Sequence, residues 1–205
     1  MVEFPLFGII NAKGASNRRP FISFPMIDGE IKIIENAVRG KASAFGLLYD
    51  HYQPKIYRFV LIKVGRREDA EDLTHQVFIN AWQNISNYKD LGFPFSSWLY
   101  RIARNQVIDS YRTKKPEISL DEVNEESFAA LGINEENIDD KIQIELVMKA
   151  LKELKEDYQD ILVMRFVEDL SVRETAVAVG KSEGAVKLMQ HRAIKELKKV
   201  FDTLD

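Results

Sequence analysis

Apolar residues recur at helical spacing through most of this 205-residue chain, and this periodicity constrains the fold more than any other feature. Apolar residues repeated every three to four positions line one face of a helix, whereas a half-buried strand alternates apolar and polar residues. The spacing predicts helices over 30–39, 41–63, 67–84 and 96–114, and a second helical block from about residue 140. No alternating segment predicts a strand. We therefore expect an all-α protein.

Charge and composition divide the chain into parts. Residues 116–140 contain many acidic residues and no lysine or arginine, and their sparse apolar residues show no pattern. This composition is typical of a flexible linker. The first residues are rich in proline and glycine and lack periodicity. We therefore expect two small helical domains, 29–114 and 140–205, joined by a flexible acidic linker over 115–139, with a disordered N-terminal extension over 1–28.

Several classes of protein are disfavoured. The chain has no cysteine, which excludes disulfides and thiolate metal sites, and its net charge of −3 argues against coating nucleic acid through bulk charge. No apolar run approaches the ~20 residues of a membrane span, and no signal peptide is evident. We expect a cytoplasmic protein without membrane insertion. Glu71 and His75 have a metal-binding spacing, but no third ligand is identifiable, so no metal, cofactor or enzymatic activity is predicted.

The segment 98–112 predicts a helix with an apolar stripe and a basic-polar face. The stripe is assigned to Leu99, Ile102, Ala103, Gln106 and Ile108, and the polar face to Arg101, Arg104, Asn105 and Arg112. The aromatic residues Tyr88, Phe93 and Phe95 lie just before it. Arginine contacts phosphate, and aromatic rings stack on unpaired bases. Such a helix is suited to holding a strand pulled out of duplex DNA; the alternative is an amphipathic helix with a solvated basic face.

Residues 171–201 predict a helix-turn-helix. Ser171 and Glu174 form a capping box, Gly180 ends the first helix, and Ser182 caps a second helix that runs to about Phe201. In a helix-turn-helix the second helix enters the major groove. The expected groove-facing residues are Lys181, Ser182, Glu183, Lys187, Leu188, His191, Arg192 and Lys195. Two packed helices with a glycine turn are the plainer alternative.

The two blocks together carry motifs that resemble the extracytoplasmic-function (ECF) group of sigma-70 RNA polymerase sigma factors. The matching segments, in family order, are Ala44–Tyr52, Ala70–Trp82, Phe95–Arg112, Leu170–Ala176 and Gly184–Ala193. The resemblance covers about residues 30–201. Two pairs of adjacent residues depart from the common pattern. His75-Gln76 stands where many members have Gln-Glu, and Leu188-Met189 where many have Ser-Arg.

The resemblance implies two partners, core RNA polymerase and promoter DNA, and suggests an anti-sigma factor. The helix 67–82 would dock on the clamp helices of the largest polymerase subunit through Asp69, Asp72, His75, Gln76 and Asn80. The resemblance assigns residues 29–114 to sigma region 2 and 140–205 to region 4. Region 2 would open the promoter −10 element through Asn84, Asn87, Tyr88, Lys89, Phe93, Phe95, Arg101, Arg104, Asn105 and Arg112. Region 4 would read the −35 element and pack on the polymerase flap, and the linker would be threaded toward the RNA path.

Three other readings remain open at this point. A free-standing helix-turn-helix regulator with a helical N-terminal domain would leave the aromatic and basic segment at 88–112 unexplained. A metal-dependent enzyme would need more ligands than Glu71 and His75. A helical adaptor without DNA binding would not need either basic helix.

Overall fold

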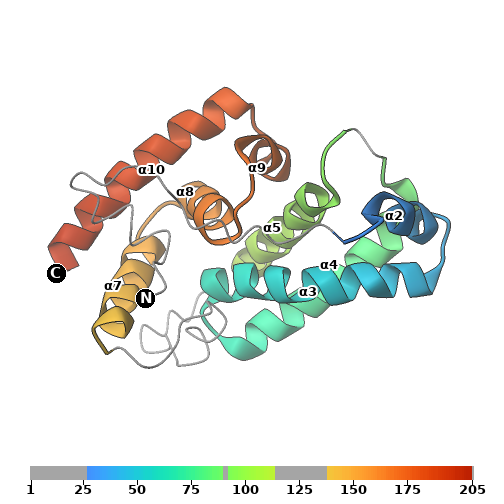
Figure 1. Cartoon of the computed structure of the whole chain (residues 1–205). Coiled ribbons are helices and arrows are strands. Elements are labelled where there is room, and N and C mark those ends of the chain that lie inside the picture. The colour runs from blue at the N-terminus through green and yellow to red at the C-terminus, as the bar shows by residue number, and fades with distance from the viewer. Residues whose placement is uncertain (1–26, 90–91, 114–137, 205) are drawn as a thin grey trace. The chain divides into compact units, whose positions relative to one another are not determined.

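The computed structural model describes residues 27–89, 92–113 and 138–204 of the chain. Every regular element in these ranges is helical, which confirms the all-α prediction. The helices belong to two compact units, one within residues 27–113 and one within 138–204 (Figure 1). The predicted extension over 1–28 and the predicted linker over 115–139 lie almost entirely outside the described residues.

The first unit is a helical bundle organised around its longest helix. It comprises α2 (Glu30–Val38), α3 (Ala42–Val64), α4 (Arg67–Asn84), the 3-10 turn η1 (Ile85–Asn87) and α5 (Phe95–Thr113). Helix α3 packs against α2, α4 and α5, and α4 also packs against α5. Leu48, Ile56 and Phe59 of α3 are fully buried among these helices. Each such side chain contributes about 1.5–3 kcal/mol relative to an exposed one.

The buried face of α5 differs from the predicted stripe. The structure buries Phe95, Leu99, Tyr100, Ala103 and Val107. Ile102, Gln106 and Ile108 are only half-buried, so their assignment to the buried stripe was wrong. The physical reason is the helical repeat of 3.6 residues, which aligns 95, 99, 103 and 107 on one side, leaves 106 at the edge of that side and turns 108 toward the basic face.

The second unit places one long helix across three shorter ones. Its elements are α7 (Ile138–Lys152), α8 (Glu156–Leu162), the π-helical turn η2 (Val163–Val167), α9 (Val172–Val179) and α10 (Glu183–Leu204). Helix α10 packs against α7, α8 and α9 (Figure 1). Leu151, Ile161 and Met164 are buried in this unit, as are Val186 and Leu197 of α10. This packing fixes which face of α10 stays in solvent.

Candidate nucleic-acid and polymerase interfaces

Helix α5 presents basic side chains on the side away from its core. Arg101, Asn105 and Arg112 are exposed, and Arg104 is half-buried, whereas Leu99 is buried on the opposite side. The burial of the apolar face holds the helix in one rotation, so these side chains point away from the bundle. The predicted basic face of this helix is therefore accessible to a polyanion.

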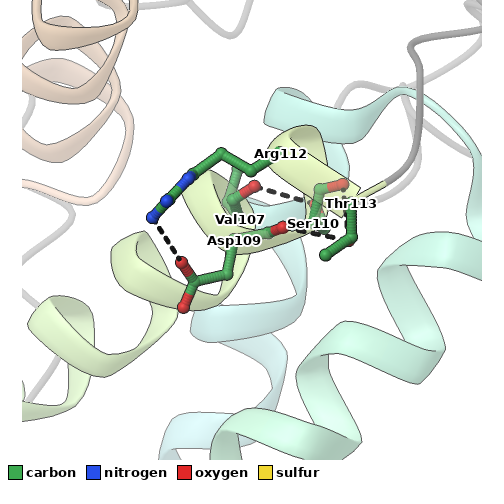
Figure 2. A network of polar contacts seen from close by, with 5 residues as sticks. All are labelled: Val107, Asp109, Ser110, Arg112 and Thr113. Atoms are coloured by element: carbon green, nitrogen blue, oxygen red, sulfur yellow. Dashed lines mark hydrogen bonds and ion pairs between the residues drawn. The ribbon is translucent and has the colours of Figure 1, made fainter.

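Arg112 makes one weak intramolecular ion pair, shown in Figure 2. Its Nη1 lies 3.7 Å from Asp109 Oδ1, and the two side chains are 78% and 63% exposed. An exposed pair of this kind contributes about 0–1 kcal/mol, so a phosphate can displace the carboxylate. Nearby hydroxyls satisfy carbonyls at the end of α5: Ser110 donates to Val107 O at 2.8 Å and Thr113 to Asp109 O at 3.0 Å.

An aromatic cluster anchors the start of α5 to the preceding loop. The Tyr88, Phe95 and Trp98 rings lie 5.2–5.4 Å apart by their centroids, and Tyr52 of α3 packs on Phe95 at 5.6 Å. Tilted and edge-on pairs at such distances are favourable for aromatic rings. Tyr88 and Trp98 are half-buried and keep part of each ring accessible.

Phe95 has a different place from the one predicted for it. It is only 2% exposed, so its ring is covered on all sides and cannot receive a base as the chain stands. Its contacts instead support the Tyr88 and Trp98 rings. Trp98 was absent from the predicted site residues. Its position three residues after Phe95, on the same side of the helix, was the signal that could have indicated it.

The end of α4, η1 and the residues between η1 and α5 carry further predicted −10 residues. Asn84, Asn87 and Lys89 are exposed, and Phe93 is half-buried. The Tyr88 hydroxyl donates a long hydrogen bond of 3.5 Å to Phe93 O, and Asn84 Nδ2 donates to Asn80 O at 2.8 Å. The predicted −10 residues therefore lie at the end of α4, in η1, in the segment that follows and on α5, and Phe95 is buried among them.

The two caps predicted for the helix-turn-helix are confirmed. Ser171 Oγ accepts from Glu174 N at 3.1 Å, and Ser171 N donates to Glu174 Oε2 at 2.7 Å. Gly180 ends α9 with φ 67°, a left-handed conformation that glycine adopts without steric cost. Ser182 Oγ accepts from Ala185 N at 3.2 Å at the start of α10. These local bonds set the turn between the two helices.

Helix α10 has sharply separated inner and outer faces. Val186, Ala193 and Leu197 are fully buried. The exposed residues on the other side are Gly184, Lys187, Leu188, His191, Arg192, Lys195 and Lys199. Arg165 braces this arrangement, because its Nε donates to Gln190 Oε1 at 3.0 Å and its Nη1 donates to Leu170 O. A basic face is thus held outward on a helix that is fixed on its inner side.

Lys181 is partly committed within its own unit. Its Nζ lies 3.4 Å from Asp157 Oδ2 of α8, with both side chains about one-third to two-fifths exposed. The Asp157 carboxylate therefore competes with DNA phosphate for this lysine, which is one of the predicted groove-facing residues. This contact could not be predicted from sequence, since the two residues are far apart in the chain.

The outward face of α4 carries the residues predicted to contact polymerase. Asp72, His75 and Gln76 are exposed, and Asp69 and Asn80 are half-buried. Gln76 Nε2 donates to Asn80 Oδ1 at 2.9 Å, and Asp69 lies 3.8 Å from an Arg66 guanidinium nitrogen. The opposite face of α4 is buried against α3 and α5. The polar face is therefore a rigid, solvent-facing surface.

The described residues offer neither a metal site nor a membrane-spanning helix. Within residues 27–89, 92–113 and 138–204, no group of three or more histidine or acidic side chains is arranged to hold a metal ion. None of the helices in these ranges combines the length and apolarity that crossing a membrane requires.

Comparison with protein families places two known modules on the two units. Sigma-70 region 2 matches residues 48–117, and Sigma-70, region 4 matches residues 144–197. The chain is 34% identical over 174 residues to the ECF RNA polymerase sigma factor BldN of Streptomyces coelicolor. The match covers 83% of this chain and 65% of BldN, so the chain spans less than two thirds of the length of BldN. It is 31% identical over 179 residues to the ECF sigma factor SigW of Bacillus subtilis, covering 82% of this chain and 94% of SigW.

Solved structures show the same fold. The structure of CnrH in complex with the cytosolic domain of CnrY matches with a TM-score of 0.65 at 22% identity, covering 86% of this chain and 99% of CnrH. The sigma factor RpoE in complex with the anti-sigma factor NepR from Bartonella quintana matches with a TM-score of 0.59 at 19% identity, covering 77% and 96%. At these identities the match indicates a shared helical fold.

Proposed function

This chain belongs to the extracytoplasmic-function group of the sigma-70 family, and we propose that it is a promoter-specificity factor for RNA polymerase. In this role it binds core polymerase, directs it to specific promoters and helps to melt the −10 element. Its contribution is binding and positioning, and the bond-forming chemistry belongs to the polymerase. The proposed place of action is the cytoplasm.

The first unit, within 29–114, would act as region 2. Its docking surface is the outward face of α4, where Asp72, His75 and Gln76 are exposed on a helix that is fixed from behind. Charged and polar groups on such a rim steer association and set its orientation. The partner surface is the clamp helices of the largest polymerase subunit.

The same unit would open the −10 element with its aromatic and basic residues. Extruding a base from duplex DNA costs a few kcal/mol, and stacking on a ring returns about 1–3 kcal/mol per base. The half-buried rings of Tyr88 and Trp98 offer such a surface, and Phe95 supports them from the core. Arg101 and Arg112 would hold the phosphates of the separated strand.

The second unit, within 140–205, would act as region 4. Its helix α10 offers Lys187, Arg192 and Lys195 to the backbone of the −35 element and packs on the polymerase flap through the same unit. Phosphate contacts of this kind position a helix in the groove, and base-edge contacts give it sequence preference.

One observation carries the proposal: two separate compact units each match a sigma region and each present an exposed basic helix face. The test is transcription in vitro with core polymerase and sequencing of the 5′ ends of transcripts. We expect starts at a small set of promoters that share a two-part upstream motif. Transcription that does not differ from core polymerase alone would contradict the proposal.

A protein of the anti-sigma kind is the regulatory partner that we propose. The relatives CnrH and RpoE were solved with bound protein partners, the cytosolic domain of CnrY and the anti-sigma factor NepR. Such a partner would compete with polymerase for the exposed face of α4. A competition assay with purified core polymerase distinguishes this from binding elsewhere, because only a competitor lowers holoenzyme formation as its concentration rises.

A free-standing helix-turn-helix regulator is not favoured. That alternative assigns no role to residues 48–117, which match Sigma-70 region 2. It also predicts specific DNA binding by the chain alone. A gel-shift measurement with and without core polymerase separates the two, since a sigma factor gives a promoter-specific complex when polymerase is present.

A further inference from the structure

Leu188 is an exposed apolar side chain in the middle of a basic surface. It is 50% exposed on the outward face of α10, between Lys187 and the pair His191 and Arg192. The core contacts of this helix are already supplied by Val186 and other fully buried residues on its opposite side. Half of Leu188 therefore stays in solvent and adds nothing to that core.

Gly184 leaves open space one helical turn before Leu188. A Cβ built at Gly184 meets no atom within 4 Å, and its backbone has no positive φ, so the fold itself does not require glycine there. Gly184 is the second residue of α10, in its first turn. Residues four positions apart lie on the same side of a helix, so the missing side chain clears a path to Leu188 from outside.

We propose that Leu188 is a specificity-determining residue that reads a thymine of the −35 element through its C5-methyl group. This inference rests on the proposed function of α10 as the helix that enters the major groove. Thymine is the base that presents a methyl group in that groove, and apolar side chains recognise it by direct contact. The bare backbone at Gly184 lets the edge of the groove approach closely enough for this contact.

The charges around Leu188 favour DNA as the occupant of this surface. Lys187, Arg192 and Lys195 are exposed and would bind phosphates on the two sides of the groove. Leucine can neither donate to nor accept from a base edge, so the favourable contact it can make in a groove is with the thymine methyl. A protein surface such as the polymerase flap is the competing occupant, and the experiment below separates the two.

The test replaces each thymine of a mapped −35 element, one at a time, by deoxyuridine, which pairs normally but lacks the methyl group. Binding is measured with holoenzyme reconstituted from core polymerase and the full chain. Burying one methyl group contributes about 0.8 kcal/mol, so we expect one position where deoxyuridine weakens wild-type binding about fourfold. For Leu188→Ala the same replacement should have no effect, because the contact is already absent.

Lys187→Ala is the matched control, since it should weaken binding equally to the thymine and deoxyuridine promoters. If no deoxyuridine position distinguishes wild type from Leu188→Ala while Lys187→Ala still weakens binding, the inference fails and the proposed function stands. If Lys187→Ala also leaves promoter binding unchanged, the placement of α10 in the groove fails, and the inference with it. Loss of core polymerase binding by Leu188→Ala would assign Leu188 to the flap and overturn the inference.

Gly184→Ala is an independent test, because it should weaken promoter binding without lowering the stability of the fold. The structure has room for the added methyl group, and alanine favours the helix, so the melting temperature of the chain should not fall. Promoter affinity should fall severalfold at the thymine promoter if the groove approaches this backbone closely. Unchanged affinity would contradict the close approach.

Discussion

His51 is held in a polar cluster on α3 that disfavours its charged form. Its Nε2 lies 2.9 Å from Lys55 Nζ, and Lys55 also lies 5.2 Å from the centre of the Tyr52 ring. Burial, followed by the positive charge of Lys55, lowers the pKa of His51, and Glu30 opposes this shift. Glu30 accepts a hydrogen bond from the Tyr52 hydroxyl, which ties α2 to α3.

The first prediction concerns the pH dependence of stability. Because the pKa of His51 is lowered in the folded state, the unfolded state binds the proton more tightly, and stability is lost as the pH falls through the ordinary histidine value of about 6.5. Wild type should therefore lose more stability than His51→Gln between about pH 7.5 and about pH 5.5. Urea denaturation followed by tryptophan fluorescence measures this, since Trp82 and Trp98 are the two tryptophans and both lie in the first unit. Equal losses in the two proteins would contradict it.

The second prediction concerns Phe95. Its ring is 2% exposed and contacts Tyr52, Tyr88 and Trp98, so Phe95→Ala should leave a cavity and lower the free energy of unfolding of the first unit by about 3–5 kcal/mol. Phe93→Ala is the matched control, because Phe93 is half-buried in the loop and should cost clearly less. Denaturant midpoints from tryptophan fluorescence measure both. Similar small losses would return Phe95 to the list of base-stacking candidates.

Helix α10 has an inner face that is buried in the core and an outer face that is exposed to solvent. Val186 and Leu197 are fully buried, whereas Lys187 and Arg192 are exposed. Substitutions on the outer face should therefore change binding without changing the fold. The same separation holds for α4, whose buried face includes Val77 and whose exposed face includes Asp72.

The third prediction is that Lys187→Ala and Arg192→Ala each weaken promoter binding by holoenzyme and reduce its dependence on salt. Each phosphate contact contributes about 0.9 to the slope of log affinity against log salt concentration, so each variant should lower the slope by about 1. A salt titration of promoter affinity measures this. Weaker binding with an unchanged slope would place the two side chains away from phosphate.

The fourth prediction is that Asp72→Lys weakens association with core polymerase about tenfold, which corresponds to about 1.4 kcal/mol. The reason is a reversed charge on the exposed face of α4 that we propose docks on the clamp helices. Glu35→Lys makes the same change at an exposed position of α2 and is the matched control. If both variants bind polymerase equally well and fold normally, the face of α4 is not the docking surface.

Local bonds explain which elements were predictable from sequence. The capping box joins Ser171 to Glu174 within one turn, and Ser182 bonds to Ala185, so the residue types alone indicate where α9 and α10 begin. Helical periodicity likewise predicted the ranges of α3 and α4. These features depend on neighbours in the chain and need no knowledge of the tertiary fold.

Contacts between distant residues explain what sequence could not predict. Lys181 faces Asp157, and Arg165 binds Gln190, and neither pair follows from spacing along one helix. The burial of Phe95 depends on Tyr52, which lies in another helix, so its sequence position suited either a surface ring or a core ring. The candidate DNA residues were therefore predictable as a set, and their individual burial was not.

The proposed function requires two units that act on separate stretches of DNA. Each unit has its own core and its own exposed basic helix face, and they are connected through residues 114–137, which lie outside the described structure. A unit with a small basic surface binds DNA weakly alone. When both units are held on one polymerase, the second contact becomes intramolecular and gains a high effective concentration.

The measurement that tests this most directly uses the absence of cysteine from the chain. Single variants Lys89→Cys and Lys195→Cys each give one attachment point for a chelated iron that cleaves nearby DNA, one in each unit. In a holoenzyme bound to a mapped promoter, we expect the first to cleave around the −10 element and the second around the −35 element. Cleavage of the same stretch of DNA from both positions, or cleavage that does not require core polymerase, would contradict the account.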